Sequence, residues 1–341
     1  MKRFAALFML LMLLCGGVSA KAEEPREVAL KQHFLQLADE VIVTEDSVIF
    51  TDAVSAQPME IAKNPGRTAI LYGSLVTLWV EAGGRADGIV GGGSAAELYD
   101  TVIGRDISQD AGVTVLAENS AGKSWSTESI VAFRPDVIIC STAMSGYKTI
   151  AGPAAAAGIP VIAVDYNDFA DYLKWFKVFC HLNNRADLWD SVAVSALDEV
   201  VDIICCTPEN VEQGPKVFSV FEGTGSSLSA NTSATVIGAM IGQLGGVNIA
   251  DGGATNGAEH ISINLEAVYA ADPDLIVIQG HGGAQTQNVY GGNAVWQALR
   301  AVKSGRVYDL DPSLFHNKPN RRFSEAYRML AEMLYPGMDF D

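Results

Sequence analysis

The chain is poor in positive charge, poor in histidine, and without a long apolar run beyond its first twenty residues. Its 23 lysines and arginines stand against 40 aspartates and glutamates, a net charge of -17, which argues against nucleic acid or an anionic membrane as a partner. None of its five histidines lies in a cluster with metal-ligand spacing. No later stretch reaches the roughly 18 apolar residues of a membrane span.

Motifs for nucleophilic or metal-assisted catalysis are also lacking. The sequence contains neither Gly-x-Ser-x-Gly nor His-Glu-x-x-His, and Gly223–Ser227 misses both the nucleophile pattern and the lysine of a phosphate-binding loop. We therefore expect a protein that is not an enzyme, with an exported hydrolase as a weaker alternative. An adhesin or pure interaction protein is a third class, and it would have no small-molecule cleft.

The N-terminus has the pattern of a secretory signal. Lys2 and Arg3 precede an apolar run from 4 to 14, and Val18-Ser19-Ala20 is a small-residue cleavage site. We expect residues 1–20 to be removed, which takes the net charge from -17 to -19, and the mature protein to be periplasmic. A lipoprotein anchor at Cys15 is the alternative, disfavoured because Leu14 is not small.

Four cysteines follow the signal, and none has metal-ligand spacing. They are Cys140, Cys180, Cys205 and Cys206. An exported protein can oxidise such thiols, but their pairing cannot be deduced from sequence, and buried thiols are the ordinary interpretation. We assign them no function.

The most informative pattern is a duplication. Residues 125–139 and 263–277 align without a gap at an offset of 138 residues. Each copy has a polar helix start, a Pro-Asp turn and a four-residue apolar run, which is typical of a helix followed by a buried parallel strand. Identical residues at equivalent positions include Glu128 with Glu266, Pro135 with Pro273, and Asp136 with Asp274.

Strands alternate with helices on both sides of the duplication, so we predict two similar α/β lobes with mostly parallel sheets and a ligand cleft between them. The lobes are expected at 21–167 and 212–341, joined by a helical linker over 168–211. A helix from Arg185 to about Cys205 would be about 30 Å long and would connect the lobes rigidly. Large hinge closure is therefore not expected.

Several further segments carry a family resemblance. They are Asn64-Pro65-Gly66-Arg67, both copies of the duplicated stretch, 244–249 (LGGVNI) and 305–308 (GRVY). With these, nearly the whole mature chain resembles the periplasmic substrate-binding proteins of ABC importers for iron-siderophore, haem and cobalamin, a family that includes the vitamin B12 binding protein. The resemblance implies a monomer that delivers its ligand to an ABC permease dimer with its ATPase.

The resemblance also assigns a role to the duplicated glutamates. In that family one glutamate on each lobe pairs with arginines of the permease, and these roles fall on Glu128 and Glu266. Two exposed carboxylates on a rigid two-lobed body can orient it on a symmetric basic partner. The alternative is that each glutamate simply favours the start of its helix through the helix dipole.

Ligand-binding residues are expected in loops beyond the carboxyl ends of the strands. Aromatic side chains there could stack on a macrocycle or catecholate, and basic ones could meet a carboxylate or oxyanion. His281 is the best single candidate, because small neighbours in His281-Gly282-Gly283 allow close approach. The full set is Tyr72, Ser74, Tyr99, Trp125, Tyr147, Glu222, Ser226, His281, Tyr290, His316 and Arg321; taken singly, each is equally explained by packing.

The resemblance leaves the ligand open. Among the expected ligands a ferric siderophore ranks first, followed by haem or cobalamin. We therefore expect the ligand to be an iron chelate or a corrinoid. We expect no resident cofactor and no metal bound by the protein itself. Capture of an oxyanion such as molybdate, or of a divalent metal ion, by the same fold is the alternative. Ser226 and the glycine-rich loops suit an oxyanion, whereas the scattered histidines do not suit a free metal ion.

Overall fold

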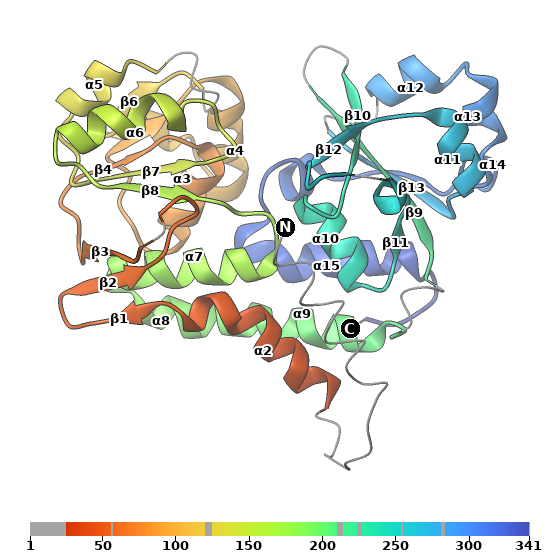
Figure 1. Cartoon of the computed structure of the whole chain (residues 1–341), viewed down its shortest axis with the longest axis horizontal. Coiled ribbons are helices and arrows are strands. Elements are labelled where there is room, and N and C mark those ends of the chain that lie inside the picture. Colours follow the sequence, from red (N-terminus) through yellow and green to blue (C-terminus); the bar gives the residue numbers. More distant parts are fainter. Residues whose placement is uncertain are drawn as a thin grey trace.

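The computed structural model describes residues 25–55, 57–119, 125–209, 214–223, 227–253, 255–280 and 284–340. Two α/β lobes stand side by side on a layer of long helices, as predicted (Figure 1). No helix within the described ranges is long and apolar enough to cross a membrane. The predicted signal and Cys15 lie outside these residues.

The first lobe is built on a parallel sheet of five strands in the order β6-β5-β4-β7-β8. The strands are β4 (Thr68–Ile70), β5 (Gly88–Val90), β6 (Thr114–Ala117), β7 (Val137–Ser141) and β8 (Val161–Val164). The helices are α3 (Gly73–Glu81), α4 (Gly93–Ile103), α5 (Thr127–Ala132) and α6 (Tyr147–Ala156), with a 3-10 turn at Ile107–Gln109. A small antiparallel sheet of β1 (Ile42–Val43), β2 (Ser47–Phe50) and β3 (Met59–Ala62) adjoins this lobe.

The second lobe has a mixed sheet of six strands, ordered β12-β10-β9-β13-β14 with β11 beside β9. These are β9 (Lys216–Glu222), β10 (Leu228–Asn231), β11 (Val247–Asn248), β12 (His260–Ser262), β13 (Leu275–Gln279) and β14 (Val307–Asp309). Its helices are α10 (Val236–Gln243), α11 (Leu265–Ala271), α12 (Ala284–Tyr290), α13 (Ala294–Ala298) and α14 (Arg300–Lys303), with short turns at Ile249–Gly252, Pro312–His316 and Asn320–Arg322. Strands β10 and β12 run antiparallel to their neighbours, which the sequence did not predict.

The duplicated stretch folds the same way in both lobes, down to its hydrogen bonds. In each copy the aspartate after the proline accepts a backbone N–H from the residue that leads into the first parallel strand. Asp136 Oδ2 lies 2.9 Å from Arg67 N, and Asp274 Oδ2 lies 2.8 Å from Lys216 N. The same pairs are joined again, since each aspartate N–H donates to the partner's carbonyl at 2.8 Å. The Asp of the Pro-Asp turn therefore locks two neighbouring strands together.

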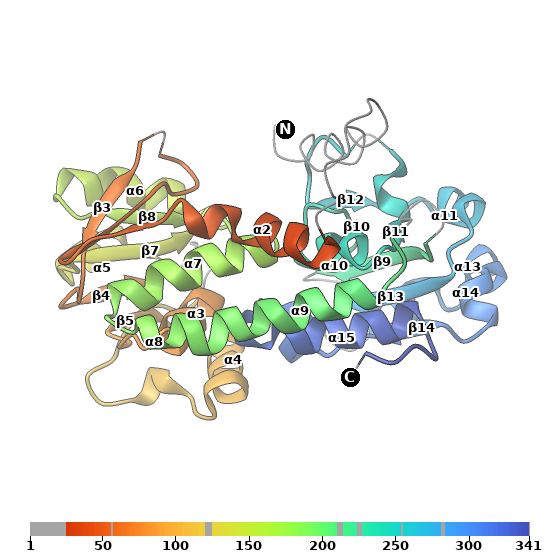
Figure 2. The ribbon, with the colours of Figure 1, turned by 90° about the horizontal axis from the view of Figure 1, so that it is seen from below.

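Both lobes rest on a shared helical layer. It contains α2 (Arg26–Asp39), α7 (Phe169–Leu182), α8 (Ala186–Leu188), a π-helical stretch Trp189–Val194, α9 (Ser195–Cys206) and α15 (Phe323–Leu334). Seen from below, α9 and α15 lie side by side and α2 runs along α7 (Figure 2). The predicted 185–205 helix is thus a run of three helical segments over 186–206.

The helical layer belongs to the hydrophobic core and is not an exposed connector. Most of α7 is buried, and its Phe169 ring packs 4.9 Å from Phe323 and 5.9 Å from Tyr327 on α15. One continuous apolar cluster joins the first lobe, these helices and part of the second lobe. Close-packed interiors resist continuous deformation, which supports the expectation of limited hinge closure.

The cysteines make no disulfide within the described part of the chain. Cys140 on β7 and Cys180 on α7 are buried, Cys205 is half-buried and Cys206 is exposed. Burial raises the pKa of both Cys140 and Cys180 to about 12. The buried pair therefore stays protonated and inert, as the ordinary interpretation of these residues expects.

Candidate functional site

The carboxyl ends of the parallel strands of both lobes meet where the lobes face each other. Tyr72 follows β4, Tyr166 follows β8, and Asn320 belongs to the segment after β14. The Tyr166 hydroxyl lies 3.2 Å from Asn320 Oδ1. The Asn320 amide also donates to the Ser74 carbonyl at 3.2 Å and to the Thr77 hydroxyl at 2.9 Å, both on α3. These bonds tie the second lobe to the start of α3 in the first.

The second lobe presents a stack of three aromatic rings at this meeting point. The ring of Phe221 near the end of β9 stacks both with His260 at the start of β12 and with His316 at the end of the Pro312–His316 turn. The ring centroids of Phe221 and His260 are 4.5 Å apart at 20°, and those of Phe221 and His316 are 6.1 Å apart at 5°. We call these three residues the aromatic platform. Stacked, nearly parallel rings offer flat apolar surface with imidazole nitrogens at its edges.

The pKa of the His260 imidazole is lowered, which favours its neutral form. Partial burial lowers the pKa of His260. The carboxylate of Glu259 acts to raise this pKa, and the charge of Lys318 lowers it further. A neutral imidazole has one nitrogen lone pair available to a metal or a proton donor. Sequence analysis missed His260, because it lies on an antiparallel strand outside the duplicated stretch. The Phe221 ring was missed as well, since it precedes the loop rather than lying in it.

The ammonium of Lys318 and the hydroxyl of Tyr72 lie near the aromatic platform. Lys318 donates to the Tyr166 carbonyl, and its ammonium lies 5.2 Å from the centre of the Tyr166 ring. Burial lowers the pKa of Lys318, while Glu259, Asp171, Asp165 and Asp168 act to raise it. The pKa of the Tyr72 hydroxyl is raised by burial, with Glu259 also raising it and a hydrogen bond with Ser74 opposing. Tyr72 therefore remains a hydrogen-bond donor at neutral pH.

Buried polar side chains support the loops behind the platform. Glu222 is 1% exposed, and its Oε1 accepts from the Thr286 N–H and the Thr286 hydroxyl, both at 2.8 Å. Gln279 at the end of β13 donates to the Phe315 carbonyl at 2.6 Å and accepts from Asn231 at 3.0 Å. Glu222, predicted as a ligand contact, instead holds α12 against β9.

Several other predicted ligand residues are engaged elsewhere. Tyr99 has no exposed surface, and its hydroxyl donates to the Val90 carbonyl at 2.7 Å, so it is a core residue. Tyr290 stacks on Trp296 at 5.4 Å. Trp125 donates to the Asn119 carbonyl at 2.9 Å. Arg321 lies 3.4 Å from the Glu81 carboxylate and joins the two lobes.

Of the remaining predicted residues, Tyr72, Ser74 and His316 lie where the lobes meet. Ser74 is 3% exposed; its backbone carbonyl accepts from Asn320 and its side chain is hydrogen-bonded with the Tyr72 hydroxyl. Tyr147 opens α6, and burial raises its pKa, with Asp52 and Cys140 also raising it. Ser226 and His281 lie outside the described residues.

The duplicated glutamates occupy equivalent, exposed positions. Glu128 is in the first turn of α5 and Glu266 in the first turn of α11. Each helix is capped by the predicted polar residue: the Ser126 hydroxyl accepts from Ser129 N at 3.1 Å, and Asn264 Oδ1 accepts from Glu266 N at 3.0 Å. These caps satisfy the helix starts. Helices α5 and α11, which carry the two exposed glutamates, lie one on each lobe (Figure 1).

No group of three or more metal-ligating side chains occurs in the described parts of the chain. The two equivalent glutamates are on separate lobes, so they do not form a neighbouring pair of acids.

Known proteins share this fold. A periplasmic binding protein from Veillonella parvula superposes with a TM-score of 0.65 at 14% identity, covering 85% of this chain and 98% of that one. IsdE of Staphylococcus aureus, complexed with heme, gives 0.63 at 18%, covering 79% and 98%. The vitamin B12 binding protein BtuF of Vibrio cholerae gives 0.61 at 15%, covering 79% and 96%.

Sequence comparison agrees. The chain is 29% identical over 126 residues to the high-affinity heme uptake system protein IsdE of Staphylococcus aureus, an alignment that spans 36% of this chain and 42% of that relative. A family model described as "Periplasmic binding protein" matches residues 70–314. That match shows that this chain belongs to the periplasmic binding protein family, whose members bind solutes for transport and are not enzymes.

Proposed function

We propose that this protein acts outside the cytoplasm, where it captures a metal chelate on the aromatic platform between its lobes. It then delivers the chelate to an ABC permease. The observation that carries the proposal is the stack of Phe221 between His260 and His316 at the carboxyl end of the second-lobe sheet. A flat ring system can lie against such a surface. The family relatives named above for heme and vitamin B12 make the same ligand class reasonable here.

The chemistry favours a macrocycle over a ferric siderophore. A neutral imidazole such as His260 can ligate a metal only where the chelate leaves an axial position open, as haem does. A siderophore that supplies all the ligands of its iron leaves no coordination position for the imidazole. We therefore place haem or a corrinoid ahead of a ferric catecholate, which reverses the order drawn from the sequence.

We expect the two histidines to set haem affinity. In a titration of the purified protein with haem, followed by absorption, His260→Ala and His316→Ala should each weaken binding by about 10-fold or more. His33→Ala is the matched control, because His33 lies on α2, away from the platform. Haem binding that is unchanged in both platform variants would contradict this site. Binding of a ferric catecholate or cobalamin but not haem would reassign the ligand.

We propose further that Glu128 and Glu266 dock on basic residues of the permease. The double variant Glu128→Ala/Glu266→Ala should lose transport by about 10-fold or more, since each removal leaves a permease cation without its partner. Ligand affinity should stay within about twofold of the native protein, because neither side chain belongs to the aromatic platform. Transport measured in reconstituted vesicles checks this.

Glu97→Ala is the control for docking, because Glu97 is an exposed glutamate on α4 of the first lobe. It should transport as the native protein does. Native transport by the double variant would contradict docking through the duplicated glutamates.

A further inference from the structure

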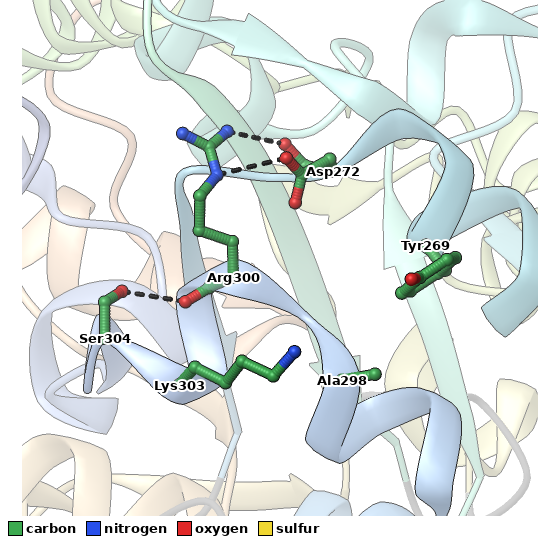
Figure 3. A pocket seen from close by; sticks show the side chains of 6 residues that line it. All are labelled: Tyr269, Asp272, Ala298, Arg300, Lys303 and Ser304. Atoms are coloured by element: carbon green, nitrogen blue, oxygen red, sulfur yellow. Dashed lines mark hydrogen bonds and ion pairs between the residues drawn. The ribbon is translucent and has the colours of Figure 1, made fainter.

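A pocket on the outer face of the second lobe lies beside one of the duplicated glutamates. It has a volume of about 600 Å³ and is lined by Tyr269, Asp272, Ala298, Arg300, Lys303 and Ser304. Figure 3 shows these side chains, contributed by α11, α13, α14 and the residues that follow α11 and α14. We call it the outer pocket. It is separate from the aromatic platform, with which it shares no residue.

The outer pocket shares helix α11 with the predicted docking carboxylate. Glu266 and Tyr269 both lie on α11, three residues apart, and side chains at that spacing share one face of a helix. The Tyr269 side chain is 54% exposed, which is unusual for a large aromatic group. A partner that covers Glu266 must therefore also cover Tyr269 and the mouth of the pocket.

The two basic residues of the pocket differ in what they already bind. Arg300 is neutralised locally: its Nε lies 3.1 Å from Asp272 Oδ2 and its Nη1 lies 2.7 Å from Asp274 Oδ1. It also donates to the Asp272 carbonyl at 3.0 Å. Arg300 is thus a structural brace between α14 and the duplicated turn, rather than a free cation.

Lys303 is the uncompensated charge. It is exposed, and no ion pair joins it to any described residue. In Figure 3 its side chain extends along the pocket past Arg300 toward Ala298. The Ser304 hydroxyl stands beside it and donates to the Arg300 carbonyl at 2.9 Å, which leaves oxygen lone pairs but no proton for an incoming group. The Lys303 ammonium and the Tyr269 hydroxyl both line the outer pocket, and both are hydrogen-bond donors that suit a carboxylate.

The first lobe does not repeat this arrangement. At the positions equivalent to Tyr269 and Asp272 it has Val131 and Arg134. Its helix α6, which leads into β8 as α14 leads into β14, ends in alanines and carries no basic residue in its last turn. Duplication preserved the glutamate on both lobes, whereas the exposed Tyr269 and the lysine in the last turn of α14 have no counterparts at the equivalent places of the first lobe.

We propose that the outer pocket receives an acidic side chain of the permease, so that the second lobe docks through a pair of opposite charges, Glu266 to a basic residue and Lys303 to an acidic one. This inference rests on the proposed docking function. Charge complementarity selects the partner. A free carboxylate is repelled over most of a chain of net charge -17, and the Lys303 cation in the outer pocket gives it one matched position on the second lobe. Exposed tyrosine at an interface also supplies rigid contact area.

Charge reversal tests the proposal with the mature chain and its permease–ATPase complex in nanodiscs. The chain is used without ligand, so that the result does not depend on ligand identity. Lys303→Glu should weaken docking by at least about 10-fold, because it places like charges together, and Lys303→Gln by about threefold. Lys63→Glu is the charge-matched control, because Lys63 follows β3 and bonds the Thr44 carbonyl far from both docking helices; it should dock within about twofold of native.

Carbodiimide coupling provides a second readout, since it joins a lysine amine to a carboxylate in direct contact. We expect a peptide in which Lys303 is linked to an Asp or Glu of the permease. If Lys303→Glu docks as the native chain does while Glu266→Ala docks weakly, the outer pocket is not part of the interface and the inference is overturned, although docking through Glu266 stands. If Glu128→Ala, Glu266→Ala and Lys303→Glu all dock normally, the proposed docking face itself is wrong.

Discussion

Gly238→Ala should destabilise the protein by more than about 3 kcal/mol, because the new methyl group has no room. A Cβ at Gly238 on α10 would overlap the carbonyl oxygen of Thr232, and it would lie 2.6 Å from the carbonyl carbon and 2.9 Å from Ser233 Cα. These are backbone atoms, so no side-chain rotation relieves the overlap. The Thr232 carbonyl is held in place by the Thr235 N–H at 3.1 Å and the Thr235 hydroxyl at 2.8 Å.

The same helix supplies the control. A Cβ at Gly242 meets nothing within 4 Å, so Gly242→Ala should stabilise the protein by about 0.5–1 kcal/mol through helix propensity. Thermal unfolding of both variants beside the native chain measures the difference. Equal melting temperatures for the two variants would show that α10 does not approach residues 232–233 as closely as the structure has it.

The second large effect is a pH dependence at the junction of the lobes. Glu81 at the end of α3 has a side chain that is 7% exposed, and Arg321 of the second lobe lies 3.4 Å from its Oε1. Among the described residues its Oε2 has no hydrogen-bond partner, and neither does the hydroxyl of Tyr172. Burial raises the pKa of Glu81 from 4.5 to about 7, although Arg321 and Arg322 act to lower it.

A raised carboxyl pKa means that the folded protein binds this proton more tightly than the unfolded chain. The stability that the protonated Glu81 carboxyl contributes to the fold is therefore fully present below pH 4.5 and is lost as the pH rises through about 7. Between pH 5 and pH 8 the free energy of unfolding of the native chain should fall by about 2.5 kcal/mol relative to that of Glu81→Gln, in which this position does not titrate.

Unfolding free energies of the two proteins across this pH range provide the test. Glu97→Gln, a change of an exposed glutamate on α4, should keep the native pH profile. Native and Glu81→Gln profiles that run parallel would exclude Glu81 as the source. Because Arg321 belongs to the second lobe, this titration also reports on contact between the lobes.

The duplicated stretch shows how far sequence alone reaches. Its polar caps, its Pro-Asp turn and its apolar run are local signals, and each acts on neighbouring residues, so the helix and strand of both lobes could be predicted. The exposed Glu128 and Glu266 follow from the same local pattern, because a first helical turn with a polar start faces solvent. Strands β10 and β12 escaped prediction, since their residues include polar Asn231 and exposed His260 and show no apolar run.

The ligand site shows the opposite case. Tyr99 was a reasonable loop candidate, yet α4 begins at Gly93 and carries its ring into the core. Residues 221, 260 and 316 are distant in sequence, and only the pairing of β9 with β10, and of β10 with β12, brings two of the platform rings together. Arg321 and Glu81, 240 positions apart in the chain, likewise meet only because the lobes share one helical layer.

The sequence by itself determined the two-lobed α/β fold and the equivalence of the lobes, because helix starts, turns and buried strands are specified by residues within a few positions of each other. The solute-binding family came from the resemblance of its motifs to that family. The tertiary structure decided which side chains form the aromatic platform, which charges join the lobes, and which side chains line the outer pocket with Lys303. These depend on contacts between segments far apart in the chain, and such contacts are set by packing rather than by local pattern.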